Sequence, residues 1–237
     1  MQYKNLILLG TSHIAKQSLQ DVKKIIEEKK PDIVALELDK RRLYALLHKR
    51  KSRISIYDIR VIGLKGFVFS LIGAWAEKRL GEYVGVAPGS EMLTAVRLAK
   101  KNKSKIALID QDIEITLKRF SKTLSWKEKW HFVVDLFKGF VLRKKEVSFD
   151  LRKVPNKKIV EELVKKVKKR YPNIYNVLIK ERNAVMAYNL SRLIQENPDR
   201  LILGIIGAGH ENDIINLIKK GNKIDYTFSY SVVNQNS

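Results

Sequence analysis

Two apolar runs, one near each end of the chain, lead into the pattern Gly-x-x-His. The first pattern joins Gly10 to His13, and the second joins Gly207 to His210. Each apolar run predicts a strand, and the spacing of apolar residues after each histidine predicts a helix. Because parallel α/β sheets bind ligands beyond the carboxyl ends of their strands, we expect both histidines to face one crevice.

Between these ends, short apolar runs alternate with longer segments of helical periodicity. Strands are predicted over residues 4–9, 33–38, 105–109, 201–207 and 224–230. Helices are predicted over residues 15–30, after Asp39, over 90–102 with Ser90 as cap, from Ser125 with Glu128 in a capping box, after Asn156, from about 172 to 196, and through 217–218.

This order of elements predicts an α/β fold with a central, mainly parallel sheet. Two strand-Gly-x-x-His-helix units flank a large, mainly helical insertion at about 57–196, which is interrupted by the strand near 105–109. We expect residues 1–237 to form one domain, because this length and a hydrophobic content of 45% are sufficient for a single large core.

Composition limits the chemistry and the location. The chain has no cysteine, so disulfides and thiolate metal sites are excluded, and a metal site must use His, Asp and Glu.

The amino terminus lacks the long apolar stretch of a signal peptide, which favours a cytoplasmic location. Residues 61–76, the most hydrophobic segment, contain Lys65 and are shorter than the roughly 20 residues of a membrane span. The chain ends soon after a predicted strand, so the natural protein can continue further.

The formal net charge of +22 indicates either an anionic partner or a strongly basic solvated surface. Basic residues gather at 40–53 and 138–170, and the second group includes an amphipathic lysine-rich helix. A solvated lysine face and peripheral contact with an anionic membrane both remain open, the latter aided by the apolar segment 61–76. Nucleic acid is the less favoured partner, because no helix-turn-helix, zinc-finger or RNA-recognition pattern is present.

Polar residues stand at the ends of several predicted strands. His13, Glu37 and His210 are the clearest, and Asp110 with Asp112 follows the third strand. Because an unpaired buried charge is costly, Glu37 within an apolar run should be paired or bound to a ligand. Two imidazoles and a carboxylate form a familiar ligand set for zinc, manganese or cobalt, and open positions on the ion would activate water for hydrolysis.

Structural alternatives exist for these residues. A histidine at a strand end is often a hydrogen-bonded structural residue. Thr11 and Ser12 are most simply helix caps. Glu91 can merely favour the positive end of a helix, and Glu181 with Arg182 can form an ordinary surface ion pair.

Six short motifs, taken in order over nearly the whole chain, resemble the TraB/PrgY family, which is related to the Tiki proteins. They are Gly10-Thr-Ser-His13, Leu36-Glu37-Leu38-Asp39-x-x-Arg42, Gly89-Ser-Glu91-Met92, Asp110-Gln-Asp112-Ile-x-Ile-Thr116-Leu117-x-Arg119, Glu181-Arg182-Asn183 and Gly207-Ala-Gly-His210. The chain departs from the family at Gln111, where arginine is common, and we expect none of its 237 residues to form the carboxy-terminal membrane helices of many prokaryotic relatives.

The resemblance implies a fold similar to the erythromycin-esterase-like and ChaN-like α/β proteins. Tiki relatives are metal-dependent proteases, and PrgY-like members are linked to peptide pheromones. The resemblance also implies that His13 and His210 are metal ligands, with Glu37 as a third ligand or the general base. Glu91 and Arg182 would complete the site.

The leading hypothesis is therefore a metal-dependent hydrolase that acts on peptides, with manganese, cobalt or zinc as its divalent ion. Glu91 would carry a proton to the leaving amine, and Arg182 would bind a substrate carboxylate or the developing oxyanion. Two alternatives stay open: a metal-independent hydrolase with a histidine as general base, and a non-catalytic protein that binds a peptide or lipid. Self-association into a homo-oligomer is open as well.

Overall fold

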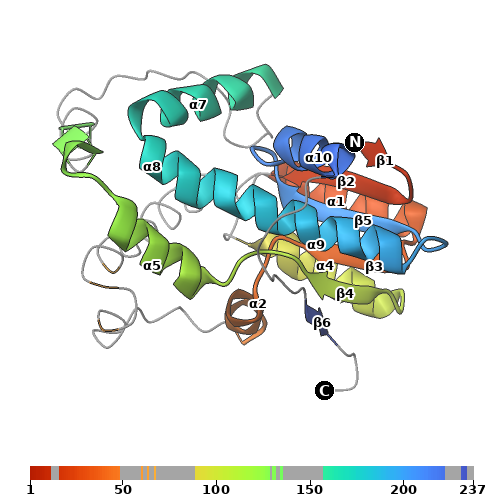
Figure 1. Ribbon diagram of the computed structural model, residues 1–237. Coiled ribbons are helices and arrows are strands. Elements are labelled where there is room, and N and C mark those ends of the chain that lie inside the picture. The colour runs from red at the N-terminus through yellow and green to blue at the C-terminus, as the bar shows by residue number, and fades with distance from the viewer. Residues whose placement is uncertain are drawn as a thin grey trace.

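A six-stranded mixed sheet forms the centre of the computed structural model (Figure 1). The structure describes residues 1–11, 16–48, 60, 63, 67, 89–128, 130–131, 134–135, 157–221 and 231–233. The strand order is β1-β2-β5-β3-β4-β6. The strands are β1 (Gln2–Tyr3), β2 (Leu6–Thr11), β3 (Ile33–Leu36), β4 (Lys105–Leu108), β5 (Ile202–Gly207) and β6 (Ser231–Val233).

The four inner strands are parallel, and the two outer strands pair antiparallel with their neighbours. The prediction of an α/β fold with a mainly parallel sheet is thus confirmed. The first strand starts later than predicted, at Leu6, because Lys4 has a φ of 50° in the turn after β1. The predicted strand at 224–230 lies outside the described residues, and β6 follows directly after that range.

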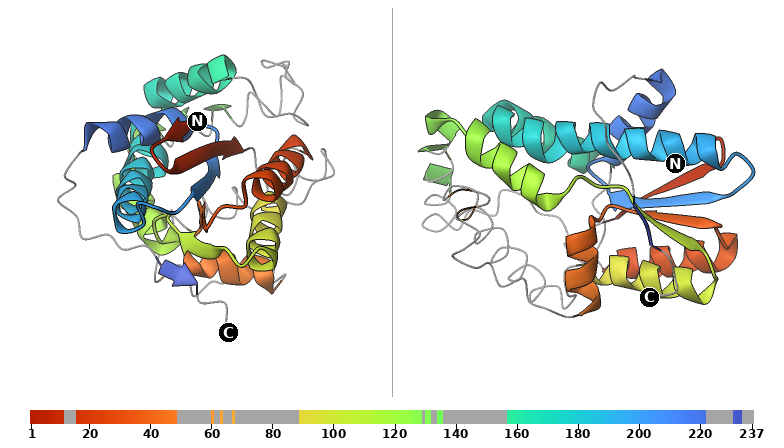
Figure 2. Two further views of the ribbon diagram at one scale, coloured as in Figure 1. Left: turned by 90° about the vertical axis from the view of Figure 1, so that its right-hand side faces the viewer. Right: turned by 60° about the horizontal axis from the view of Figure 1, so that its bottom comes forward.

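Helices cover both faces of the sheet, as the two views of Figure 2 show. One face packs against α1 (Lys16–Lys29) and α4 (Ser90–Lys101), and the other against α9 (Arg182–Glu196) and α10 (Glu211–Lys220). The period of two in β3 explains this division, since Ile33 and Ala35 belong to the second face whereas Val34 and Leu36 belong to the first. Inner strands with both faces covered are continuously apolar, and β3 is buried at every position.

Strand β5 lies between β2 and β3, so the two Gly-x-x-His sequences follow neighbouring parallel strands. Thr11 pairs with Gly207 in the β2–β5 register, and the Ala208 amide donates to the Thr11 carbonyl at 2.8 Å. Both sequences therefore leave the sheet at the same edge.

Gly10 allows a close approach between β2 and the turn after β5. A Cβ on Gly10 would lie 3.1 Å from the Cα of Ala208. Neither Gly10 nor Gly207 has a positive φ, so neither supplies left-handed backbone geometry.

The remaining helices are α2 (Lys40–Leu47), α5 (Ile113–Thr123), α7 (Lys157–Arg170), α8 (Pro172–Tyr175) and the π-helix η1 (Asn176–Glu181). Helix α8, η1 and α9 follow one another directly, so the long helix predicted to end near Glu196 is present but contains a π segment. Figure 1 shows α5, α7 and α8 to one side of the sheet.

Two predicted caps have different outcomes. The capping box is confirmed, because the Ser125 amide donates to Glu128 at 3.1 Å and the Glu128 amide donates to the Ser125 hydroxyl at 3.2 Å. The cap of α4 was predicted wrongly: Ser90 is the first helical residue, and Gly89 occupies the cap position with a φ of 76°. The predicted cap Asn156 and nearly all of the apolar segment 61–76 lie outside the described residues.

None of the helices within the described residues is long and apolar enough to cross a membrane.

Candidate functional site

Glu37 is buried at the carboxyl edge of the sheet, directly after β3. Its side chain is 3% exposed. One carboxylate oxygen, Oε2, accepts a 2.5 Å hydrogen bond from the Gly207 amide at the end of β5. The other oxygen, Oε1, accepts from Arg182 Nη2 and lies 3.6 Å from His210 Nε2. The expectation that this buried glutamate is paired is confirmed.

Arg182, the first residue of α9, is enclosed by polar partners rather than exposed on a surface. Its Nε and Nη2 donate to the two oxygens of Asp110 at 3.0 and 2.6 Å, and its Nη1 donates to the Leu178 carbonyl at 3.2 Å. Burial alone would lower the pKa of Arg182, but the carboxylates of Asp110 and Glu37 outweigh it and raise that pKa. The surface-pair alternative is wrong for Arg182, although Glu181 does pair with Arg119.

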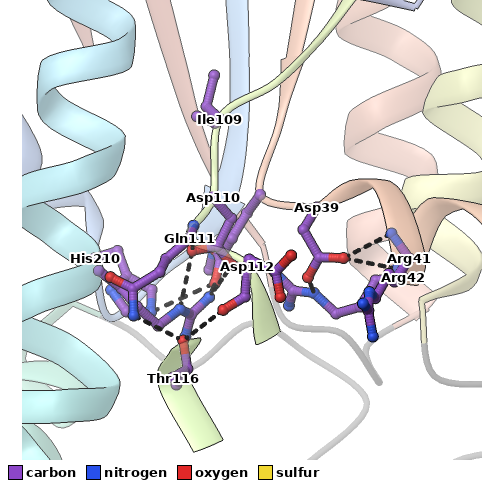
Figure 3. Close-up of polar contacts among 12 residues, drawn as sticks. Asp39, Arg41, Arg42, Ile109, Asp110, Gln111, Asp112, Thr116 and His210 are labelled. Carbon is purple, nitrogen blue, oxygen red and sulfur yellow. Dashed lines mark hydrogen bonds and ion pairs between the residues drawn. The ribbon is translucent and has the colours of Figure 1, made fainter. Parts of the chain in front are cut away.

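Asp110 connects the two arginines of the site. Its side chain is 0% exposed, and it accepts from Arg42 as well as from Arg182. Arg42, in α2, also binds Asp39 through Nε at 2.9 Å, and Figure 3 shows Asp39, Arg42 and Asp110 together at the strand ends. Burial opposes the charge of Arg42, but Asp110 raises its pKa. The sequence placed Asp110 at a strand end without assigning it a role.

His210 is held by a short chain of hydrogen bonds. Its Nδ1 meets the side-chain oxygen of Asn183, which is 1% exposed. The Asn183 Nδ2 donates to Asp213 Oδ2 at 3.1 Å, which fixes the amide with its oxygen toward the imidazole. A carbonyl oxygen only accepts, so Nδ1 carries the proton, and in the neutral ring Nε2 keeps its lone pair on the side facing Glu37.

Residues after β4 complete the edge of the site. Gln111 is 6% exposed and donates to the Thr116 hydroxyl at 3.1 Å. Asp112 caps α5 by accepting from the Glu114 amide at 2.8 Å. Figure 3 shows Gln111, Asp112 and Thr116 between His210 and the Asp39 end of the site. Gln111, the departure from the family motif, therefore serves to attach the start of α5.

The structure describes one of the two remaining predicted site residues. Glu91 is 1% exposed in the first turn of α4. His13 belongs to residues 12–15, which lie outside the described residues.

The donor set is partly suited to a metal ion. His210 Nε2 and Glu37 Oε1, 3.6 Å apart, are close enough for both to contact one ion at bonds of about 2.0 to 2.2 Å. Within the described part of the chain, no group of three or more His, Asp or Glu side chains is arranged to hold a metal. Of the three predicted ligands, Glu37 and His210 lie within the described residues and His13 lies outside them.

Fold and site together define a class: an α/β protein with a buried cluster of acidic, basic and imidazole groups at the carboxyl edge of its parallel strands. The family model of the TraB/PrgY/gumN family matches residues 2–229. The chain therefore belongs to this family, as its motifs predicted.

Individual relatives agree with this assignment. An uncharacterized protein of Methanocaldococcus jannaschii is 36% identical over 229 residues, covering 93% of this chain and 56% of the relative. The mouse and human proteins named TraB domain-containing protein are each 25% identical over 228 residues, covering 86% of this chain and 60% of theirs. The chain thus spans less than two thirds of the length of these relatives.

Proposed function

We propose that this protein is a metal-dependent hydrolase that cleaves peptides, acting in the cytoplasm or at the cytoplasmic side of a membrane. The observation that carries the proposal is the position of Glu37, buried between Arg182 and His210. A buried carboxylate beside an imidazole is a typical arrangement for activating water.

The residues that would hold a divalent ion are His210 through Nε2, Glu37, and His13 as the third ligand. Manganese, cobalt and zinc suit such a set of imidazole and carboxylate donors. When bound, the ion would polarise the scissile carbonyl and lower the pKa of a bound water toward about 7.

Glu37 would accept the proton of the attacking water, or act as a ligand with its orientation fixed. Its two protein donors, the Gly207 amide and Arg182, hold the carboxylate in one position. Arg182 acts as a positioning residue in this proposal, because Nε, Nη1 and Nη2 all have protein acceptors. Glu91 would carry the proton to the leaving amine.

A metal-independent hydrolase is the second candidate. The contact between Asn183 and His210 Nδ1 favours it, because an imidazole oriented through Nδ1 is also the form of a general base. In that case Glu37 would stabilise the protonated imidazole.

Peptide cleavage with and without metal distinguishes these functions. Chelated protein would be reloaded with manganese, cobalt or zinc and mixed with synthetic peptides, and new amino termini would be measured by mass spectrometry. We expect cleavage only after reloading, with a loss of about 100-fold or more in Glu37→Gln. Glu114→Gln is the matched control, since Glu114 pairs with Arg41 on α2.

Full cleavage by metal-free protein would contradict metal dependence and support the second candidate. Binding of a peptide without cleavage under every metal condition would contradict hydrolysis and support a binding protein.

A further inference from the structure

A groove between α7 and α10 adjoins the candidate site. It consists of two hollows of about 330 and 340 Å³ that share Lys168, Tyr175 and Asp213, and we call it the α7–α10 groove. One hollow reaches Gly209, beside His210, and the other reaches Asn183, the hydrogen-bond partner of His210. The groove therefore borders Gly209 and Asn183, two residues that adjoin the imidazole on which the proposed function depends.

The carboxylates that line this groove already have protein partners. Glu161 accepts from Asn212 Nδ2 at 2.9 Å, and Asp213 accepts from Asn183 Nδ2 at 3.1 Å. Glu211 lies 3.3 Å from the amino group of Met1. Their negative charges are thus partly satisfied within the protein.

The lysines of the groove differ from these carboxylates. Four lysines line the groove: Lys165, Lys168, Lys180 and Lys220. None of them forms an ion pair with another described residue. Lys168 lies over the ring of Tyr175, 5.3 Å from its centroid, a contact that leaves its net positive charge in the groove. Unpaired cations along a concave surface attract a negatively charged ligand.

The groove also offers apolar contacts between its charges. Val160, Val164 and Leu217 line it and are partly exposed. Val164 stands 3.8 Å from the position that a Cβ on Gly209 would take, so α7 lies directly over the second Gly-x-x-His turn. A groove lined by both apolar and cationic side chains suits an extended peptide better than an isolated small anion.

We propose that the α7–α10 groove binds an extended segment of an acidic peptide and leads it to His210. This inference rests on the proposed hydrolase function, because it names the class of substrate for the same site.

Binding of two labelled peptides to the full chain tests the proposal. One peptide alternates glutamate with leucine, and the other has glutamine at every glutamate position. Fluorescence anisotropy would be measured at constant ionic strength in chelator, so that binding is observed without cleavage. We expect the wild-type protein to bind the glutamate peptide about tenfold or more tightly than the glutamine peptide.

Two charge-reversed variants of α7 distinguish binding by the groove lysines from attraction by the overall positive charge of the protein. Lys165→Glu with Lys168→Glu alters the groove, and Lys166→Glu with Lys169→Glu makes the same change in net charge at positions that do not line it. The first variant should lose about tenfold or more in affinity for the glutamate peptide, whereas the second should change it about twofold or less. Circular dichroism would show that both variants keep their helix content.

Equal losses in the two variants, or equal affinity for the two peptides, would overturn the proposal. Equal cleavage of the glutamate and glutamine peptides would contradict the proposed peptide binding in the groove, but it would agree with the hydrolase function. Selective binding of the glutamate peptide with no cleavage in the metal-loaded protein would contradict the hydrolase function alone.

Discussion

Buried charges at the strand ends act as one group, because each arginine is shared between carboxylates. Asp110 is 0% exposed and accepts from both Arg42 and Arg182, while Arg182 also reaches Glu37. Such a network positions Glu37 only while every member has a partner. Loss of one carboxylate should therefore affect stability as well as function.

Asp110→Asn should destabilise the protein by about 3 to 5 kcal/mol, because it removes the charge that faces two arginines of the site. Urea unfolding followed by circular dichroism measures this change. Asp199→Asn, in an exposed turn, is the matched control and should change the unfolding free energy by less than about 0.5 kcal/mol. Equal effects at the two positions would contradict the proposed role of Asp110.

The tautomer of His210 gives a second prediction for a single residue. Nitrogen NMR of the protein, which has four histidines, should show the proton of the neutral His210 ring on Nδ1, because Asn183 presents an acceptor there. In Asn183→Ala the ring should populate both tautomers, and cleavage should fall by about 10 to 100-fold.

Asn189→Ala controls for the loss of a buried amide from the same helix. Asn189 donates to the Ile109 carbonyl at 2.9 Å, so this variant should lower stability without changing the tautomer of His210. Finding the proton of the wild-type neutral ring on Nε2 would contradict the proposed orientation.

The sequence indicated which residues belong to the site better than it indicated which of them are in contact. Glu37 and His210 could be identified because each interrupts or follows an apolar strand. The central place of Asp110 could not be identified, since its partner Arg182 is 72 residues away and is brought to it by the packing of α9 on the sheet. The role of Asn183 was also missed. Its motif with Glu181 and Arg182 was visible, but only the fold shows which of the three side chains faces His210.

At the scale of elements, the capping box at Ser125 is joined to α8 by the carboxylate of Glu128. Asn173 donates to it through its amide at 2.7 Å and through Nδ2 at 2.8 Å. Burial raises the pKa of Glu128, but the hydrogen bonds from Asn173 and Ser125 outweigh burial and lower it below the ordinary 4.5. One carboxylate thus connects two helical segments that are distant in sequence.

Glu128→Gln should lower the unfolding free energy by about 1.5 to 3 kcal/mol at neutral pH, because hydrogen bonds to a charged group are lost. A lowered folded pKa means that this stabilisation is present above the unfolded pKa and disappears as the pH falls through the folded value. Denaturant unfolding at several pH values should therefore show the two proteins converging in acid.

Glu28→Gln provides the comparison for Glu128. Glu28 is exposed and lies 4.0 Å from Lys24, and its replacement should change stability by less than about 0.5 kcal/mol. A difference between wild type and Glu128→Gln that stays constant into acid would contradict the prediction.

Periodicity predicted most of the described helices and strands, but not how the strands are ordered. The insertion of β5 between β2 and β3 depends on contacts between the ends of the chain, which a local pattern does not contain. The π segment η1 was also not predictable, because its residues have ordinary helical periodicity. That segment precedes Arg182 directly, and its Leu178 carbonyl accepts from the Arg182 side chain.

At the scale of the whole molecule, we propose that the net charge of +22 serves contact with an anionic membrane surface. Trp126 and Trp130 are 83% and 69% exposed and stand one helical turn apart, which suits insertion at a lipid interface. We expect the protein to cosediment with phosphatidylserine vesicles more than with phosphatidylcholine vesicles.

Replacing both Trp126 and Trp130 with alanine should weaken vesicle binding by about tenfold. Ile115→Ala, at a residue 49% exposed on α5, should leave it nearly unchanged. Cosedimentation that is equal for the two lipids, or tighter binding to duplex DNA at matched salt, would contradict membrane contact.

We expect both Gly-x-x-His motifs and Glu37 to form one metal site at the carboxyl edge of the sheet. Anomalous scattering from a crystal soaked in manganese tests this expectation most directly, because the measurement locates the ion and its ligands together. We predict one strong peak in contact with His210 Nε2, Glu37 and the imidazole of His13. A structure in which the two imidazoles face separate surfaces, with no peak beside Glu37, would contradict it.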